Sequence, residues 1–183
     1  NSASFEALYS AFARMQMQRT WDAILNAPMT LDDIVFGELL WAASKAFLSG
    51  TAILAVIWLL GLTHAPLSLW IIPLTFLIGI CFAGMALVMT ALSPSFDFFM
   101  FYMTLIMTPM SLLCGVFFPP SQLPAAMQAL AQVLPLTHAV ELVRPLIYGE
   151  VPARWPAHVA ILLVYGATGF CIALGIMRRR LLK

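Results

Sequence analysis

Four long apolar stretches occupy most of the sequence and set the strongest limit on its fold. They cover roughly residues 39–62, 67–92, 96–118 and 156–177. A helix needs about 20 apolar residues to cross the hydrocarbon core of a bilayer, which is about 30 Å thick. Apolar residues make up 62% of the chain, more than the roughly half that is typical of soluble domains. The sequence therefore predicts an all-α fold, a polytopic bundle of transmembrane helices.

The basic residues indicate how the bundle is oriented in the membrane. They lie around the start of the first stretch and directly after the last one: Arg14, Arg19, Lys45, Arg178, Arg179, Arg180 and Lys183. Segments rich in Lys and Arg remain in the cytoplasm. Both ends of this chain are therefore expected to be cytoplasmic. Residues 119–155 carry only Arg144 and Arg154 as basic residues and are expected outside.

A polar segment precedes the first stretch. Residues 20–28 read as a short helix closed by Asn26 and Pro28, and its apolar side chains Trp21, Ile24 and Leu25 form one compact face. We expect this face to need a partner or a layer of lipid headgroups. Thr30 and Asp33 then form a capping-box pattern, which predicts that a long helix begins at Leu31. Upstream, the helical spacing of apolar residues at positions 5–15 predicts the inner end of a further span.

The outer segment reads as two short helices, one over roughly 121–133 and one after Pro135 with Thr137 as its N-cap. Each is too short to cross the membrane, so we expect a re-entrant or interfacial pair. Glu141 and Arg144 are three positions apart, which permits an ion pair. The pair of helices could be a structural staple, or an outer gate or cargo contact formed by His138, Glu141 and Arg144.

Small residues recur at four-residue spacing in two of the stretches. Ala42, Ala46 and Gly50 form one such row, and Ala167, Cys171 and Gly175 form the other. Small residues allow helix backbones to approach closely in lipid. The rows therefore predict close helix packing, either within one subunit or between two subunits.

Several chemistries find no support in the sequence. It contains no phosphate loop of the form G-x-x-x-x-G-K-[ST], no H-E-x-x-H and no G-x-S-x-G. His64, His138 and His158 are scattered, so we expect no metal site and no cofactor. Lys45 and Asp97 lie near cytoplasmic span ends, where snorkelling suffices, which argues against ion-coupled transport. A net charge of +1 without a basic patch argues against nucleic-acid binding.

Two passages resemble a known family. They are "SFEALYSAFARMQMQRTWDAILNAPMTLDDIVFGELLWAASKAFLSG" and "GVFFPPSQLPAAMQALAQVLPLTHAVELVRPLIYGE". Both are similar to the permease subunits of type-2 ABC exporters, in particular the lipooligosaccharide-exporter group that includes nodulation protein J. The family has six spans. The resemblance implies that residues 1–183 form a single transmembrane permease domain that lacks the first span and the outer part of the second.

The resemblance also implies partners and a cargo. Such a permease dimerises, binds a separate cytoplasmic ATPase subunit and exports an amphipathic lipooligosaccharide, related to nodulation factors, across the bacterial inner membrane. By position, the segment from Arg19 to Pro28 resembles the coupling helix that docks on the ATPase. Trp21, Ile24 and Leu25 would insert into the ATPase groove, and Arg19 and Asp22 would form the polar rim.

Three other readings remain open at the level of sequence. Within the same class, the permease could export drugs or polysaccharides. From a different class, the chain could be a membrane enzyme acting on lipid-linked sugars, with Glu141, His138 or Asp97 as catalytic groups. A membrane scaffold without transport activity is the third possibility.

Overall fold

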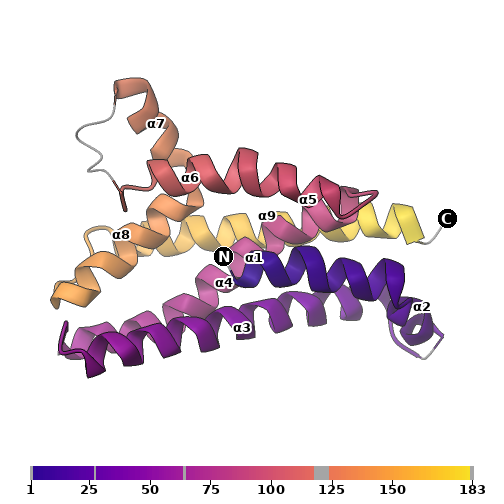
Figure 1. The fold of residues 1–183 in the computed structure, drawn as a ribbon, viewed down its shortest axis with the longest axis horizontal. Helices are drawn as coiled ribbons and strands as arrows, with labels where there is room; N and C mark the ends of the chain where they lie inside the picture. Colours follow the sequence, from indigo (N-terminus) through magenta and orange to yellow (C-terminus); the bar gives the residue numbers. More distant parts are fainter. Residues whose placement is uncertain (1, 27, 64, 118–123, 182–183) are drawn as a thin grey trace.

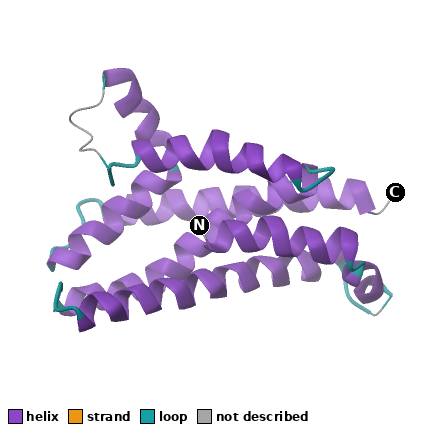
Figure 2. Ribbon diagram, viewed as in Figure 1, coloured by secondary structure: helices purple, strands orange, loops and turns teal. Residues whose placement is uncertain are grey.

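The structure is a computed structural model that describes residues 2–26, 28–63, 65–117 and 124–181. Within those residues every regular element is a helix, as predicted (Figure 2). Three helical segments have the length and composition of membrane spans: Leu31–Leu59, Pro66–Leu92 and Trp155–Arg180. The longer helices run roughly along one common axis and form an elongated bundle (Figure 1).

The chain begins with one helical run in which α-helical and π-helical hydrogen bonding alternate. It consists of α1 (Ser2–Phe5) and the π-helical segments η1 (Glu6–Ser10) and η2 (Ala13–Met17). Leu8, Phe12 and Met15 are buried, which confirms the helical spacing read from the sequence. π-Helical turns are rare in proteins, and those that do occur are often found at functional sites. Here they carry the charged residues Glu6 and Arg14.

The next two helices match the sequence prediction closely. The short helix α2 covers Thr20–Leu25. The long helix α3 covers Leu31–Leu59 and begins at the predicted residue. Its capping box is formed: the Asp33 backbone N–H donates to Thr30 Oγ1 at 3.3 Å, and the Thr30 backbone N–H donates to Asp33 Oδ2 at 3.0 Å. These local bonds satisfy backbone donors at the helix start and fix where α3 begins.

Helix α4 (Ile71–Leu92), entered through the 3₁₀ turn η3 (Pro66–Trp70), packs between α3 and α9 (Trp155–Leu181). Glycines permit the close approach of α4 and α9. A Cβ added at Gly169 would lie 2.7 Å from the carbonyl carbon of Gly84. A Cβ at Gly79 would lie 3.0 Å from the Ala43 Cα on α3. Backbone contact of this kind is typical of helix packing in membranes.

The two predicted rows of small residues have different surroundings. Ala42 is fully buried, and Gly50 faces Thr75 of α4 so closely that an added Cβ would lie 2.5 Å from its methyl group. This row therefore packs inside the chain. Ala167 and Cys171 are exposed, and Gly175 has no neighbour within 4 Å of an added Cβ. That row faces outward, while Gly166, Gly169 and Ala173 make the inner contacts of α9.

The third predicted span is shorter than expected. The elements α5 (Asp97–Tyr102), η4 (Met103–Met107) and α6 (Thr108–Leu113) form one apolar helical segment that ends at Leu113. Residues 114–117 are turns and bends, with Gly115 at a φ of 82°, a left-handed conformation that ends helices and favours glycine. The predicted end at Phe118 lies outside the described residues.

Two short helices follow, α7 (Ala125–Val133) and α8 (Pro135–Tyr148). They lie at the opposite end of the bundle from α2 and the C-terminus (Figure 1). Residues 121–123, predicted as the start of the first helix, lie outside the described residues. The prediction that Thr137 caps the second helix is wrong, because α8 begins at Pro135 with Leu134 as its N-cap. Proline is favoured at the first helical position because its φ is already helical and no backbone N–H is lost.

Candidate functional site

The segment predicted to couple to an ATPase forms the short helix α2 and its two flanking connections at one end of the bundle (Figure 1). Arg19 is exposed and holds a left-handed φ of 49° directly before α2. Pro28 and Met29, between α2 and α3, are also exposed. The side chains of Asp22 and Leu25 lie outside the described residues. The exposed part of this connection is therefore formed by residues on both sides of α2.

Trp21 does not face the surroundings, so its predicted placement on an exposed face is wrong. Its side chain is 1% exposed, and its Nε1 donates to Glu38 Oε1 at 3.3 Å. Ile24 is partly buried against the same core. An indole offers a large apolar surface and one donor, and both are used inside this chain. Trp21 thus attaches α2 to α3.

A network of charged side chains lies beside this connection, and the sequence analysis did not identify it. Its centre is Glu6, whose side chain is 8% exposed. Lys45 Nζ lies 2.6 Å from Glu6 Oε2, and Trp41 Nε1 donates to Glu6 Oε1 at 2.8 Å. Ser10 Oγ donates to Glu6 Oε2 at 3.0 Å. The carboxylate of Glu6 is thus held by donors from two helical segments.

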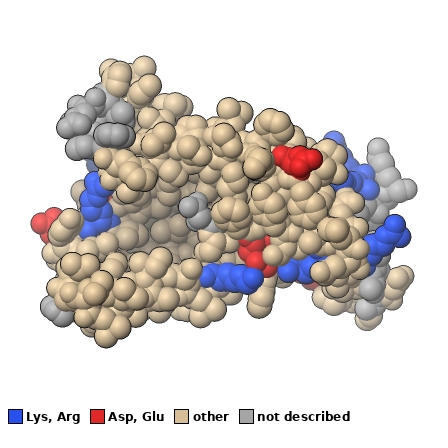
Figure 3. All heavy atoms as spheres, viewed as in Figure 1, with Lys and Arg blue, Asp and Glu red and all other residues tan. Residues whose placement is uncertain are grey.

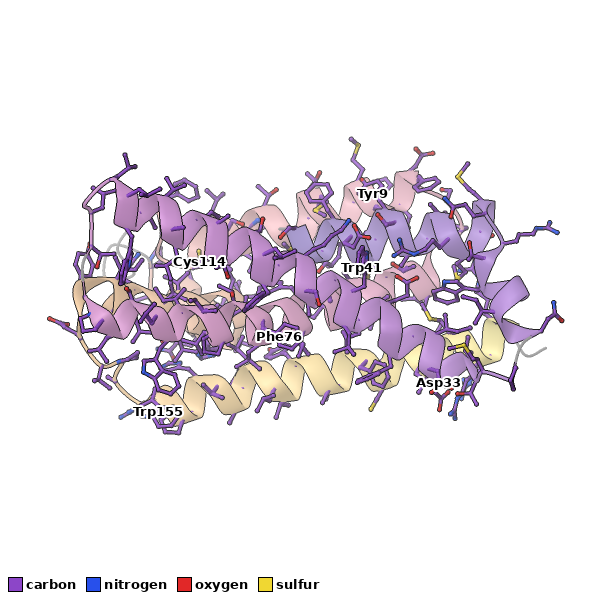
Figure 4. The ribbon with its side chains drawn as sticks, turned by 90° about the horizontal axis from the view of Figure 1, so that it is seen from below. Tyr9, Asp33, Trp41, Phe76, Cys114 and Trp155 are labelled. Atoms are coloured by element: carbon purple, nitrogen blue, oxygen red, sulfur yellow. The ribbon has the colours of Figure 1, made fainter. Side chains whose placement is uncertain are left out.

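Arg14 connects Glu6 to a second carboxylate. Its Nε donates to Glu38 Oε1 at 2.7 Å, its Nη2 also contacts Glu38 Oε2, and it lies 3.4 Å from Glu6 Oε1. The chain of contacts Lys45–Glu6–Arg14–Glu38 alternates in charge and joins the first helical run to α3. Acidic and basic side chains are in contact where these two elements lie side by side (Figure 3), and Trp41 is labelled on α3 in Figure 4.

Lys45 therefore differs from its expected role. The sequence suggested a snorkelling lysine near a span end, but Lys45 lies in the middle of α3 and is paired with Glu6. Charged groups within apolar helices are costly unless they are paired, and this pairing satisfies that requirement. Glu6 carried no signal because its partners on α3, Trp41 and Lys45, lie 35 and 39 positions away.

Two further contacts close the same end of the bundle. Arg178, near the end of α9, donates from Nε to Asp32 Oδ1 in the first turn of α3 at 3.0 Å. Arg180 donates from Nη1 to the carbonyls of Ala91 and Ser93 at 3.0 and 2.8 Å, at the end of α4. The predicted common side of the basic C-terminal segment and the α2–α3 connection is thus consistent with their positions in the fold.

At the other end of the bundle, α8 and α9 bring together side chains that the sequence left apart. His138 Nδ1 lies 2.8 Å from His158 Nδ1, and His158 Nδ1 lies 3.4 Å from Glu141 Oε2. The prediction that these histidines are scattered is therefore wrong for His138 and His158. Their meeting depends on the packing of α8 against α9, which spacing within either helix does not reveal.

The predicted ion pair between Glu141 and Arg144 is also wrong. Arg144 Nη2 donates to the carbonyl oxygen of Gly115 at 2.5 Å, so it ties α8 to the turn after α6. Glu141 turns toward His158 instead. Asp97 starts α5 at the opposite end of the bundle from α8 (Figure 1), so it does not join His138 and Glu141 in one catalytic group.

Two cavities lie on different sides of α8. One has a volume of about 410 Å³ and an almost entirely apolar lining that includes Trp70, Leu142, Leu146 and Trp155. The other has a volume of about 650 Å³, and its lining includes Cys114, His138, Glu141, Arg144 and His158. Trp155 and Cys114 mark the two regions in Figure 4. Helix α8 therefore separates an almost entirely apolar cavity from one that also carries charged and imidazole side chains, called the polar cavity below.

Comparison with known proteins identifies the family. Residues 2–148 match the family model described as ABC-2 type transporter. The chain is 45% identical over 182 residues to nodulation protein J of Rhizobium leguminosarum bv. viciae, and the match covers 100% of this chain and 70% of that protein. Nodulation protein J of Bradyrhizobium diazoefficiens is 47% identical with the same coverage. The protein of that name in Sinorhizobium fredii is 44% identical, again over 100% of this chain and 70% of its own length.

These matches confirm the resemblance read from the two quoted passages. They agree with the helical bundle and its apolar spans, which indicate a multi-pass membrane protein. The chain therefore belongs to the ABC-2 type transporter family, as a permease subunit of the nodulation protein J type.

Proposed function

We propose that this permease exports an amphipathic lipooligosaccharide across the bacterial inner membrane, driven by a separate ATPase subunit. The observation that carries the proposal is the 44–47% identity over the whole chain to proteins named for nodulation. The chain contains no phosphate loop. If ATP that is bound by a phosphate loop drives export, another subunit must therefore bind it. Drug or polysaccharide export is the alternative within the same class.

The two cavities beside α8 support an amphipathic cargo. An acylated oligosaccharide has an apolar chain and a polar, hydrogen-bonding headgroup. The apolar cavity near Trp155 suits the first, and the polar cavity with His138, Glu141 and Arg144 suits the second. We assign these three residues to an outer cargo contact on this basis.

We further propose that the connection from α2 to α3 docks on the ATPase in the cytosol. The structure changes which residues would make this contact. Trp21 is committed to the core, whereas Arg19, Pro28 and Met29 are exposed, with Met29 at 47%. Trp21 would then position the docking segment through Glu38 rather than insert into the ATPase itself. In this arrangement both ends of the chain are cytoplasmic and α7 and α8 lie at the outer face.

A second copy of the permease completes the proposed transporter. The outward row of Ala167, Cys171 and Gly175 on α9 offers a surface on which another helix could approach closely. The exposed apolar side chains of α3, such as Leu48 and Ile53, would contact lipid or that copy.

Site-directed cross-linking tests the ATPase contact. The full-length permease with Met29→Cys, co-expressed with the ATPase from the same gene cluster, is treated with a short photoreactive thiol reagent. We expect a permease–ATPase adduct. The matched control is Ala129→Cys on α7, which is exposed at the opposite end and should give no adduct. An adduct from Ala129→Cys and none from Met29→Cys would contradict the proposed docking side.

A further inference from the structure

The cluster of His138, Glu141 and His158 borders the proposed cargo contact and shares two residues with it, and its geometry carries a separate inference. One ligand atom from each of the three side chains lies within 4.8 Å of the other two. His138 and Glu141 come from α8 and His158 from α9, so the cluster joins two helices. Two imidazoles and one carboxylate form a ligand set that is common for Zn²⁺.

The second ring nitrogen of His138 is oriented as in metal sites. His138 Nε2 lies 2.9 Å from the carbonyl oxygen of Gln132, which can only accept, so Nε2 carries the proton. In a neutral ring Nδ1 is then unprotonated, and its lone pair faces His158. Histidines that ligate metals almost always donate their other N–H to a carbonyl or a carboxylate in this way.

Two of the three distances between the ligand atoms are close to those around a zinc ion, and the third is within 4.8 Å. Two ligand atoms at about 2.0–2.1 Å from Zn²⁺ in tetrahedral geometry lie about 3.3 Å apart. The His158 Nδ1 to Glu141 Oε2 distance of 3.4 Å already agrees. The distance of 2.8 Å between the two Nδ1 atoms must widen by about half an ångström, a small change for imidazole rings on separate helices.

Burial and access are also suitable. His138 is 8% exposed and the His158 side chain 14%, whereas the Glu141 side chain is 51% exposed and opens the cluster to the polar cavity. An ion could enter from that side, and water from the cavity could supply the fourth ligand.

Neighbouring charges limit which metals could bind. Arg144 and Arg154 line the same cavity, although the Arg144 guanidinium is bonded to the Gly115 carbonyl. Positive charge nearby opposes a cation, and a single carboxylate is too few oxygen ligands for Ca²⁺ or Mg²⁺. Metals that bind imidazole strongly, such as Zn²⁺, tolerate these surroundings better.

We propose that His138, Glu141 and His158 bind one Zn²⁺ ion that links α8 to α9 beside the polar cavity. The ion would hold the outer helix α8 on the bundle, and its binding would not depend on the ATPase. Without metal, a hydrogen bond donated by His158 Nδ1 to His138 Nδ1 would hold the two rings together.

Equilibrium dialysis with Zn²⁺ tests the proposal on the untagged, full-length permease, purified in detergent after treatment with a chelator. We expect one ion per chain, with at least a tenfold weaker affinity in His158→Gln and in His138→Gln. The matched control is Glu150→Gln, an exposed carboxylate after α8 that is outside the cluster and should bind as the unmodified protein does.

A second measurement keeps the test independent of misfolding in the variants. Zn²⁺ should raise the melting temperature of the unmodified protein and of Glu150→Gln, but not of the two histidine variants. Binding that is equally tight in the histidine variants, or no stoichiometric binding to the unmodified protein, would overturn the proposal.

Discussion

The Lys45 ammonium lies 2.6 Å from a carboxylate oxygen of Glu6, a residue 39 positions earlier in the chain. The contact joins the middle of α3 to the π-helical segment η1. The same carboxylate accepts hydrogen bonds from Trp41 Nε1 and Ser10 Oγ, and it lies close to the Arg14 guanidinium. Glu6 is thus one of the points at which the first helical run is fixed to the membrane bundle.

This arrangement predicts a strong dependence between Glu6 and Lys45. Glu6→Gln leaves the ammonium of Lys45 without its counter-charge beside apolar helices, so the variant should melt at a lower temperature than the unmodified protein. Adding Lys45→Gln should recover part of the loss. The pair should show a coupling of about 1 kcal/mol in a double-mutant cycle of thermal or denaturant unfolding, since contacting charged residues are not additive. Strictly additive effects would contradict the pairing.

Replacing Trp21 should lower the stability of the permease itself, because its side chain is buried inside the chain and not exposed for binding the ATPase. Removing a large buried aromatic side chain commonly costs about 3–5 kcal/mol, so Trp21→Ala should lower the yield and the melting temperature of the purified permease. Trp21→Phe keeps most of the apolar contact, loses the bond to Glu38 and should cost about 1 kcal/mol. Met29→Ala is the exposed control and should leave the melting temperature unchanged. Equal stability of Trp21→Ala and Met29→Ala would contradict the buried position.

The contact between Gly84 and Gly169 predicts a strict requirement for glycine. Gly169→Ala places a Cβ 2.7 Å from backbone on α4, which must force α4 and α9 apart. We expect loss of the monodisperse peak in size-exclusion chromatography of the detergent-purified protein. Gly37→Ala on α3 has no neighbour within 4 Å and favours the helix by about 1 kcal/mol, so it should be neutral or stabilising. Similar behaviour of the two variants would argue against the close backbone contact between α4 and α9.

Much of the fold follows from local features of the sequence. The start of α3 at Leu31 is determined by Thr30 and Asp33, which are bonded to each other within a single turn. The apolar lengths of α3, α4 and α9 are similarly local. The early end of α6 at Leu113 was missed because apolar sequence continues past the helix, while Gly115 turns the backbone. The Thr137 signal does not mark the start of α8, because Pro135 is itself favoured at a first helical position and begins the helix two residues earlier.

The candidate sites depend on contacts between distant elements, and these could not be predicted. Spacing along α8 predicted a contact between Glu141 and Arg144. In the packed structure Glu141 instead contacts His158, and Arg144 donates to the carbonyl of Gly115. The apolar face of α2 was identified, yet the sequence could not show that Trp21 already has a partner in Glu38. A pattern reports which side chains need a partner, whereas only the tertiary structure reports which partner they have.

Orientation in the membrane yields a prediction of its own. With Cys81, Cys114 and Cys171 replaced by alanine, a cysteine at Met29 should react with an impermeant thiol reagent only after the cytoplasmic side is made accessible. A cysteine at Ala129 on α7 should react in intact spheroplasts, because an excess of Arg near α2 and after α9 keeps that end inside. The reverse pattern of labelling would show that the orientation is wrong.

Transport by the reconstituted complex tests the central claim most directly. The full-length permease and its ATPase are placed in liposomes, and movement of a fluorescent acylated chitin oligosaccharide is measured with and without ATP. We predict ATP-dependent movement that is lost when the phosphate-loop lysine of the ATPase is replaced, and that exceeds movement of an unacylated oligosaccharide. Movement that needs no ATPase, or ATP-driven transport that ignores the acylated oligosaccharide, would contradict the account.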